Sequence, residues 1–482
     1  MPVNAAYKAI IRLLVLCLLC SSRLGLAQET VPFRTTQETF VARFDPDHLI
    51  KESLTVSPDG RRIAYIEEFE GKQYIVVDGK DRGRYDEISG YPWGLCFSPD
   101  SKRLAYYGRV GVDWSAVVDG EPIKGFGPVV NSLERFEFSP DGKRIAFKAI
   151  SGKKVFNVID GKSEEPFDSV GRVVFSPDSK RTAYTATLGS KSSIVVDGKK
   201  GKEYGIVGNP EFGPDSRRLA YKAYPEKAWT KRSQRWFEVI DEEKGKTYWM
   251  IWDFNLFSQD GKRTVYSANS GQEAGTKSVI VIDGKEIAEP GTDLQEPLFS
   301  PDSKHFAYMA RKEREAYNVI DGTPGRTYAL VSVPVFSPDS SRVAYYAKAG
   351  SKHFVVVNGA EGMLYDEVGH PVFSSDSKKV AYAAKEKGRW FMVVDDKVGK
   401  DYDYVSKPTL SPDGTKVAYV ARIKNKECLV AGDNEGDWYD KIYPKHWRAR
   451  VSDSGVGFSS RDSFYYFAQA GNKLYFVEET VR

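Results

Sequence analysis

The chain has 482 residues, which is too long for one compact core, so several domains or a repeat array are expected. It carries 70 Lys and Arg against 66 Asp and Glu, and three of the basic residues, Lys8, Arg12 and Arg23, precede residue 28. Setting those three aside leaves 67 basic and 66 acidic residues. This balance excludes the single-sign field typical of a nucleic-acid binder, and no nucleic-acid partner is expected.

Residues 1–27 have the pattern of a secretory signal peptide. Lys8 and Arg12 precede an apolar run at residues 13–20, and residues 25–27 supply a cleavage site. The run is shorter than the roughly 20 residues that a membrane-spanning helix needs. We therefore expect a periplasmic or secreted protein without a transmembrane anchor.

Lipidation of Cys17 or Cys20 is the alternative processing route. Leu16 and Leu19 stand where a lipoprotein signal needs a small residue, which disfavours it.

Cysteine and histidine residues show no spacing typical of a metal site. After the signal only Cys96 and Cys428 remain, in different repeats. The histidines are His48, His305, His353, His370 and His446. We expect no disulfide framework, no metal and no cofactor.

The N-terminal segment, residues 28–48, precedes the repeats. Its residues 39–44, Thr-Phe-Val-Ala-Arg-Phe, lie upstream of the first full repeat, and the last repeat lacks its fourth strand. We therefore expect this segment to supply a closing strand, because an unpaired sheet edge invites aggregation.

From residue 49 to the C-terminus one turn recurs, Ser-Pro-Asp followed by Gly or Ser. Its copies begin at Ser57, Ser98, Ser139, Ser176, Gly213, Ser258, Ser300, Ser337, Ser374 and Ser411, with a degenerate copy at Ser459. The starts are 37 to 48 residues apart. This regularity indicates about eleven repeats.

Each repeat has the pattern of four short strands separated by tight turns. In the copy that begins at Ser337 the expected strands are residues 333–336, 342–347, 354–357 and 365–368. Asn358-Gly359, like Asp-Gly in other copies, tolerates the positive φ angles of a tight hairpin. The predicted fold class is therefore all-β, a β-propeller of four-stranded antiparallel blades, with an open β-solenoid as the alternative.

Eleven repeats exceed the usual four to eight blades of one ring. We therefore expect two tandem propellers, residues 49–252 with about five blades and residues 253–482 with about six. One large ring is the alternative.

The pattern Phe-Ser-Pro-Asp-Gly/Ser-Lys/Arg-Arg-apolar-Ala-aromatic, as in residues 138–147 and 175–184, resembles the WD40-like Pro-Asp repeat. That repeat builds TolB-type propellers and the propellers that precede the catalytic domain of prolyl-oligopeptidase-type enzymes. The resemblance extends from about residue 49 to the end and implies the fold and a periplasmic or secreted setting. No stretch matches the α/β domain of TolB-type proteins, and there is no GxSxG elbow of a peptidase, so those functions do not transfer.

The residues that recur in every repeat have structural interpretations. We expect the turn aspartates to cap their own turns, and not to bind calcium. We expect the recurring aromatic residues, such as Tyr65 and Tyr106, to pack between blades.

Two stretches rich in Trp, Tyr and Arg interrupt the repeat, and these residue types are enriched at binding hot spots. The candidate binding residues are Trp229, Arg232, Arg235, Trp236, Trp438, Tyr443, His446, Trp447 and Arg448. The alternative is that these side chains fill a junction between two rings and the seam at which a ring closes.

The sequence therefore predicts an exported, non-catalytic scaffold that binds a protein or peptide partner on a propeller face. The alternative is a carbohydrate-binding or carbohydrate-cleaving propeller with a glycan as ligand. A glycoside hydrolase would need two carboxylates roughly 5 to 10 Å apart across a pocket.

Overall fold

The computed structural model describes residues 34–43, 47–89, 94–123, 136–225, 235–252, 257–271, 278–289, 292–443, 457–458 and 460–481. The expected signal peptide and the candidate residues Trp229, Arg232, His446, Trp447 and Arg448 lie outside these ranges. All elements of the described residues are strands, and no helix that could cross a membrane is found among them.

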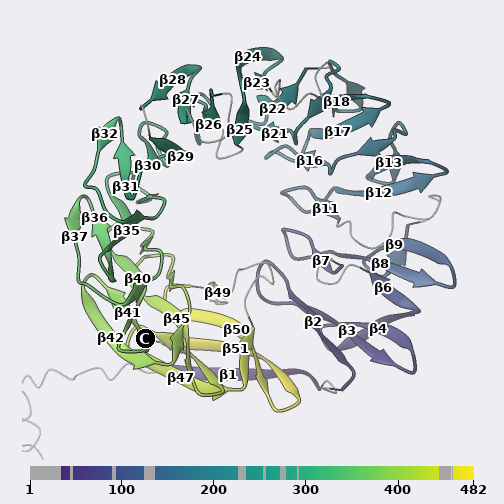
Figure 1. Ribbon diagram of the computed structural model, residues 1–482. Helices are drawn as coiled ribbons and strands as arrows, with labels where there is room; N and C mark the ends of the chain where they lie inside the picture. The colour runs from purple at the N-terminus through teal and green to yellow at the C-terminus, as the bar shows by residue number, and fades with distance from the viewer. Residues whose placement is uncertain are drawn as a thin grey trace, which may run out of the picture.

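In the described part of the chain the strands form eleven antiparallel sheets, numbered here as blades in chain order. They follow one another around a single ring (Figure 1). The first three blades contain the strands given next.

Blade 1 contains β2 (Leu49–Val56), β3 (Ile63–Phe69), β4 (Lys72–Val77) and β5 (Lys80–Tyr85). Blade 2 contains β6 (Glu87–Ser89), β7 (Cys96–Phe97), β8 (Leu104–Val110), β9 (Asp113–Val118) and β10 (Glu121–Pro122). Blade 3 contains β11 (Glu137–Phe138), β12 (Ile145–Ser151), β13 (Lys154–Ile159) and β14 (Lys162–Ser163).

Blade 4 contains β15 (Ser169–Val170), β16 (Val174–Phe175), β17 (Thr182–Leu188), β18 (Lys191–Val196) and β19 (Lys199–Lys200). Blade 5 contains β20 (Ile206–Val207), β21 (Glu211–Phe212), β22 (Leu219–Tyr224), β23 (Trp236–Ile240) and β24 (Glu243–Tyr248). Blade 6 contains β25 (Met250–Trp252), β26 (Val265–Asn269), β27 (Ser278–Ile282) and β28 (Lys285–Ala288). Blade 7 contains β29 (Asp293–Phe299), β30 (Phe306–Lys312), β31 (Glu315–Ile320) and β32 (Thr323–Pro324).

Blade 8 contains β33 (Leu330–Val331), β34 (Val335–Phe336), β35 (Val343–Ala349), β36 (Lys352–Val357) and β37 (Ala360–Glu361). Blade 9 contains β38 (Glu367–Val368), β39 (Val372–Phe373), β40 (Val380–Glu386), β41 (Arg389–Val394) and β42 (Lys397–Tyr402). Blade 10 contains β43 (Tyr404–Val405), β44 (Thr409–Leu410), β45 (Val417–Ile423), β46 (Lys426–Ala431) and β47 (Asn434–Tyr439). Blade 11 contains β48 (Lys441–Tyr443), β49 (Gly457–Phe458), β50 (Ser463–Ala470), β51 (Lys473–Val481) and β1 (Arg34–Arg43).

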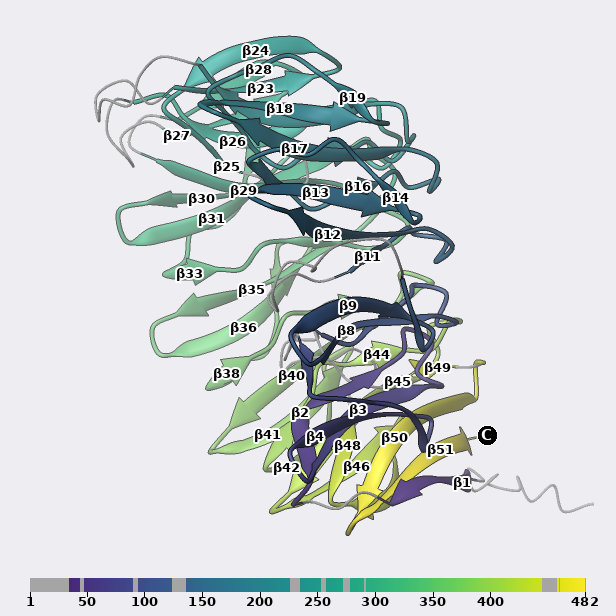
Figure 2. The same ribbon diagram turned by 90° about the vertical axis from the view of Figure 1, so that its right-hand side faces the viewer.

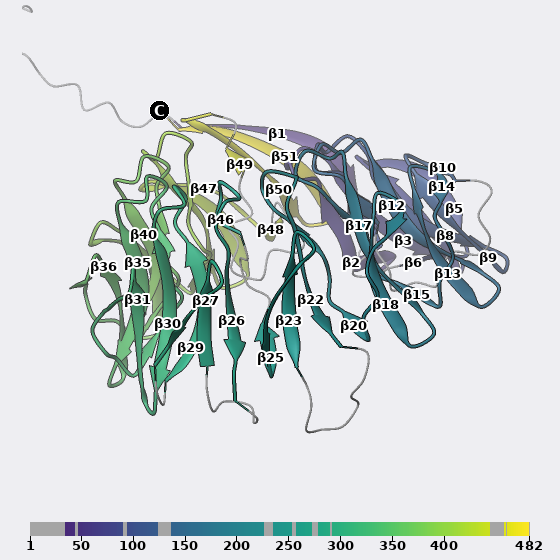
Figure 3. The same ribbon diagram turned by 90° about the horizontal axis from the view of Figure 1, so that it is seen from above.

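Each blade has four antiparallel strand positions, called A to D from the centre outward. In blade 8, for example, the inner strand A is interrupted, so β33 and β34 both pair with strand B, β35. Figure 2 shows neighbouring blades side by side along the wall of the ring. The turns between A and B and between C and D lie on one face, and the B–C hairpins lie on the other (Figure 3).

The chain crosses between blades at a point that differs from the prediction. Residues 365–368 were expected to form one outer strand of blade 8. Instead Tyr365 bridges His353 of blade 8, whereas Glu367 pairs with Lys385 and begins blade 9. The extended pattern continues through Asp366, so the periodicity cannot show where the hydrogen-bonding partner changes.

The N-terminal strand β1 is the outer strand of blade 11. It pairs with β51 from Arg34 opposite Val481 to Arg43 opposite Lys473. This strand corresponds to the one expected from residues 39–44 but begins earlier in the chain. The pairing covers an edge of β51 that would otherwise be open to other chains.

The core is divided into clusters that each join two neighbouring blades. Among the described residues there are eleven such clusters, and one of them joins the last blade to the first through Phe467, Ala42 and Val56. An open row of eleven blades has only ten interfaces. The eleventh interface closes the ring.

The structure has the single large ring, and not the two tandem propellers that were favoured. A boundary after residue 252 would separate β25 from the rest of blade 6. Across this position Ala220 of blade 5 packs with Ile251 and Tyr266 of blade 6. The interface is apolar, like the others, so no surface there resembles the outside of a separate domain.

Candidate functional site

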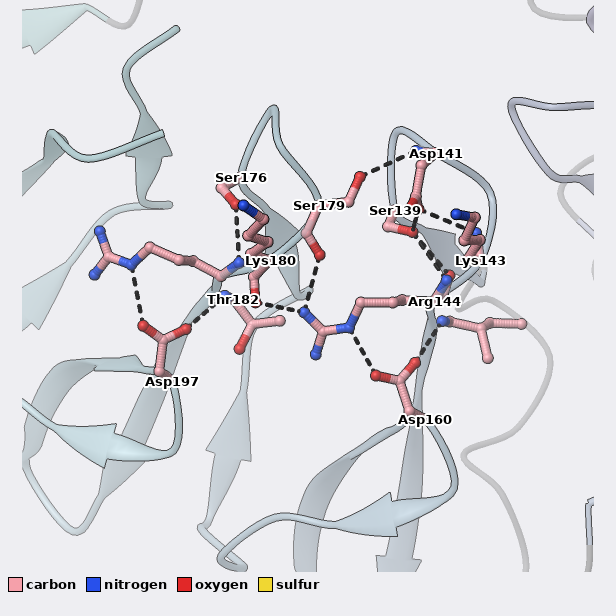
Figure 4. A network of polar contacts seen from close by, with 12 residues as sticks. Ser139, Asp141, Lys143, Arg144, Asp160, Ser176, Ser179, Lys180, Thr182 and Asp197 are labelled. Carbon is pink, nitrogen blue, oxygen red and sulfur yellow. Dashed lines mark hydrogen bonds and ion pairs between the residues drawn. The ribbon is translucent and has the colours of Figure 1, made fainter. Parts of the chain in front are cut away.

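The recurring turn caps itself, as predicted. In blade 3 the Ser139 hydroxyl donates to Asp141 Oδ1 (2.6 Å), and the backbone N–H of Lys143 donates to the same oxygen (3.1 Å). The Arg144 N–H in turn donates to Ser139 Oγ (2.9 Å). Figure 4 shows this turn and its counterpart in blade 4. The turn aspartate is thus a scaffold residue.

The arginine that follows the turn joins two blades. Arg144 Nε donates to Asp160 Oδ2 (2.7 Å) in its own blade, while its terminal NH group donates to the carbonyl oxygens of Ser179 and Lys180 in blade 4 (Figure 4). The guanidinium also lies over the Phe175 ring, 5.1 Å from its centroid. The same Nε contact to a hairpin aspartate recurs at Arg62, Arg103, Arg181, Arg218 and Arg263. Scaffold contacts therefore occupy much of this face.

The fourth residue of the turn contacts the turn of the preceding blade. Ser179 Oγ accepts the backbone N–H of Asp141 in blade 3 (3.0 Å) (Figure 4). At the equivalent position of blade 3, a Cβ on Gly142 would collide with the carboxylate of Asp100. Serine and glycine at this position therefore differ in how they contact the turn of the preceding blade.

A second set of polar contacts fixes the B–C hairpins on the opposite face. Lys72 of blade 1 pairs with Asp86, and Asp86 Oδ2 accepts the backbone N–H of Gly111 in the hairpin of blade 2 (2.6 Å). The Lys72 ammonium, followed by this N–H group, lowers the pKa of Asp86. Equivalent aspartates are Asp168, Asp366, Asp403 and Asp440. Each of these aspartates thus links the hairpins of two neighbouring blades.

Two of these fixed hairpins carry exposed apolar side chains. We define the hairpin patch as Phe69 of blade 1 with Val110 and Val112 of blade 2. Their side chains are 49%, 63% and 88% exposed. Phe69 pairs with Lys72 and the two valines flank Gly111, so the contacts of Asp86 hold the two hairpins side by side.

The structure does not bring the described candidate residues together. Trp236 begins β23, and Trp438 lies in β47 on the opposite side of the ring (Figure 1). Trp236 packs at the interface of blades 5 and 6, and Trp438 at that of blades 9 and 10. Tyr443 packs between blades 11 and 1, while Arg235 is exposed. These contacts fit the alternative of interface filling, and the binding role stays a prediction.

The hairpin patch was not among the residues predicted from the sequence, because those residues lie where the repeat is interrupted. Its signal was nevertheless present in the sequence, since Val110 and Val112 flank a hairpin glycine at positions that are usually polar.

The aromatic residues pack between blades, as predicted. Tyr204 of blade 4 meets Tyr221 of blade 5 edge to face at 6.3 Å, and Tyr402 of blade 9 meets Tyr419 of blade 10 in the same way. Similar pairs are Tyr85–Tyr106, Tyr248–Tyr266, Tyr365–Tyr382 and Tyr439–Tyr466.

The described histidines lie in separate blades, and their ring contacts do not bring them together. His305 Nδ1 lies 2.7 Å from Asp321, in the place that arginine takes in other blades, and His370 packs edge-on against Tyr346. Nδ1 of His353 lies 2.8 Å from the Asp366 carbonyl oxygen. Within the described ranges no group of His, Cys, Asp and Glu is arranged to hold a metal ion.

Comparisons with known proteins add structural likenesses but no family. No family model and no curated protein matches the sequence. Similar solved structures include a eukaryotic initiation factor, with 13% identity over 68% of this chain and 91% of that chain and a TM-score of 0.37. The Dos1 propeller has 10% identity over 69% and 93%, with a TM-score of 0.32. The propeller domain of the Trilobed protease from Pyrococcus furiosus has 12% identity over 68% and 96%, with a TM-score of 0.29.

The protein is a β-propeller. This assignment rests on the four-stranded antiparallel sheets of the described residues and on their arrangement in a closed ring.

Proposed function

We propose that this β-propeller, built from WD40-like Pro-Asp repeats, is an exported, non-catalytic scaffold that binds a protein or peptide partner through the hairpin patch. The observation that supports the binding surface is the exposure of Phe69, Val110 and Val112 on adjoining hairpins. Single exposed apolar side chains are common on protein surfaces, but a group of them on one face is typical of an interaction site.

The polar contacts of the hairpins favour binding, because they order the backbone. Asp86 accepts the N–H of Gly111, between the two exposed valines. A surface that is already ordered loses little conformational entropy on association. At the end of the same hairpin the Arg109 guanidinium lies over the Trp114 ring, and both are residue types that contribute strongly to protein interfaces.

The binding surface can be tested by cross-linking the mature protein in its native cells. We expect the double variant Phe69→Ser and Val112→Ser to lose the cross-linked partner, because both apolar contacts become polar. The matched control is Met363→Ser with Leu364→Ser, which replaces two side chains of equal exposure, 59% each, beside the outer strand of blade 8. Retention of the partner by the patch variant, or its loss in the control alone, would contradict the proposal.

Export has a separate test. We expect N-terminal sequencing of the purified native protein to begin at Gln28, because residues 1–27 carry the signal pattern. Recovery from the cytoplasm of a protein that still carries residues 1–27 would contradict export, whatever the cross-linking shows.

A further inference from the structure

Two cavities of the same construction lie between neighbouring blades. One, of about 450 Å³, lies between blades 9 and 10, and the other, of about 400 Å³, lies between blades 7 and 8. Each is walled by strands C and D of the first blade and by strand B and the C–D turn of the second. Tyr419 in the first cavity and Tyr345 in the second occupy the same place.

The cavity between blades 9 and 10 has an apolar wall. Met392 and Val394 come from strand C of blade 9, and Val417 and Val430 come from blade 10. Val398, in the outer strand of blade 9, also lines the cavity and is 54% exposed. Met392, Val417 and Val430 are buried, so Val398 provides most of the apolar surface that the hydrocarbon part of a ligand would contact.

The same cavity has a cationic edge. The lysines that line it are Lys379, Lys397, Lys400 and Lys416, against a single acid, Asp433. Lys400 pairs with Glu435 (2.6 Å), and Lys416 pairs with Asp462 (2.6 Å). Among the described ion pairs neither Lys379 nor Lys397 has a carboxylate partner. Lys379 donates instead to the Thr415 carbonyl oxygen (2.6 Å).

This excess of cations follows from departures from the repeat. In blade 6 the residue at this position is Arg263, and it pairs with Asp283 of the C–D hairpin (3.0 Å). In blade 10 the corresponding residues are Lys416 and Gly432, and the next residue of the hairpin, Asp433, is the acid that lines the cavity. Proteins tend to break their own structural rules where function requires it.

We propose that the cavity between blades 9 and 10 binds an amphiphilic carboxylate of the size of a medium-chain fatty acid. The alkyl chain lies along Val398, over the buried wall of Met392, Val417 and Val430. The carboxylate takes the position beside Lys379 and Lys397 and pairs with their ammonium groups.

The cavity between blades 7 and 8 serves as an internal comparison. Thr323 and Pro324 line it at the positions that correspond to Lys397 and Val398. Its one charged residue, Arg326, already pairs with Glu361 (2.8 Å). This cavity therefore has no unmatched cation for a carboxylate, and we expect it to stay empty.

Isothermal titration calorimetry of the mature protein with decanoate tests the proposal. We expect one decanoate per chain, with decanol and acetate binding at least about tenfold more weakly, because each lacks one half of the recognised chemistry. Equal affinity for decanol and decanoate would overturn the role of the lysines. Equal affinity for acetate would overturn the role of the apolar wall.

Variants locate the site. We expect Lys397→Glu to weaken decanoate binding by at least about tenfold, because it places a like charge beside the ligand. Thr323→Glu, the corresponding change in the other cavity, should leave the affinity unchanged. Both side chains are exposed, so folding should persist in both variants, and thermal melting verifies this. Unchanged binding by Lys397→Glu, or equal loss in both variants, would overturn the proposal.

Discussion

At the fourth turn position a serine has a strained backbone conformation, and its hydroxyl binds the turn of the neighbouring blade. Ser179 has φ near 65°, a region that favours glycine, while its hydroxyl accepts the N–H of Asp141. The serine therefore gains a hydrogen bond between blades at the expense of local strain.

Two substitutions at this serine separate the hydrogen bond from the strain. We expect Ser179→Ala to lower the free energy of unfolding by about 1–3 kcal/mol, because the Asp141 N–H loses its partner. Ser179→Gly should cost about 1 kcal/mol less, because glycine adopts the positive φ freely. Urea unfolding measures both, with Ser190→Ala in an exposed hairpin as the control. A glycine variant less stable than the alanine variant would contradict this account.

The turn aspartates also predict how stability depends on pH. The Ser300 hydroxyl and then the Lys304 N–H lower the pKa of Asp302 to about 2. The Ser411 hydroxyl is the main cause that lowers the pKa of Asp413 to about 2. The pKa is also lowered at Asp59, Asp100, Asp141, Asp178, Asp215, Asp260, Asp339 and Asp376.

A depressed carboxyl pKa stabilises the fold above the pKa of the unfolded chain, about 3.9. We therefore expect the stability to be fully present above about pH 4 and to fall as the pH drops from there toward about 2. Urea midpoints at several pH values and constant ionic strength measure it. Ser300→Ala should lessen the dependence, and a flat profile below pH 4 would contradict it.

At the scale of elements, β1 is held by a buried ion pair as well as by its ladder. Arg34 pairs with Glu479 of β51 and donates to the Asn434 carbonyl oxygen (2.8 Å) in blade 10. Tyr466 donates to the other oxygen of Glu479 (2.8 Å). Burial raises the pKa of Glu479, although Arg34 opposes this. The strand thus connects blades 10 and 11.

Removal of the arginine should be costlier than removal of both charges. We expect Arg34→Ala to lower the free energy of unfolding by about 3–5 kcal/mol, because Glu479 stays buried without a counter-charge. Arg34→Met combined with Glu479→Gln should recover much of the loss.

Deletion of residues 28–44 should lower the melting temperature sharply, because it exposes the edge of β51. Thermal melting measures all three, and an unchanged melting temperature in the deletion would contradict the closing role.

At the scale of the whole molecule, the ring depends on every interface. Blades 5 and 6 share an apolar cluster like those at the other interfaces, and the last blade needs a strand from the N-terminal segment. No segment of a few blades has all its interfaces covered.

Fragments test this dependence. We expect residues 49–252 and residues 253–482, produced separately, not to fold as stable domains, because each would expose two blade interfaces to water. Circular dichroism and thermal melting of the fragments measure this, with the mature chain as the control. Two fragments that each melt cooperatively at the temperature of the whole chain would favour two propellers instead.

Much of the fold follows from local chemistry that the sequence displays directly. Proline and aspartate in each turn, and Asp-Gly or Asn-Gly in each hairpin, act within a few residues of themselves, so the four-stranded blade could be predicted. The candidate site was less accessible. Trp236 and Trp438 attracted attention by residue type, but which surfaces are exposed depends on how blades meet.

The sequence by itself determined the blade, the number of repeats and the capping role of Asp141, because these rest on contacts between near neighbours in the chain. Only the tertiary structure decided that the repeats form one ring, that Asp366 lies where the chain changes blades, and that two neighbouring hairpins expose apolar side chains. These features depend on contacts between residues far apart in the chain, up to the pair of Arg34 and Glu479. Periodicity along the chain carries no information about such partners.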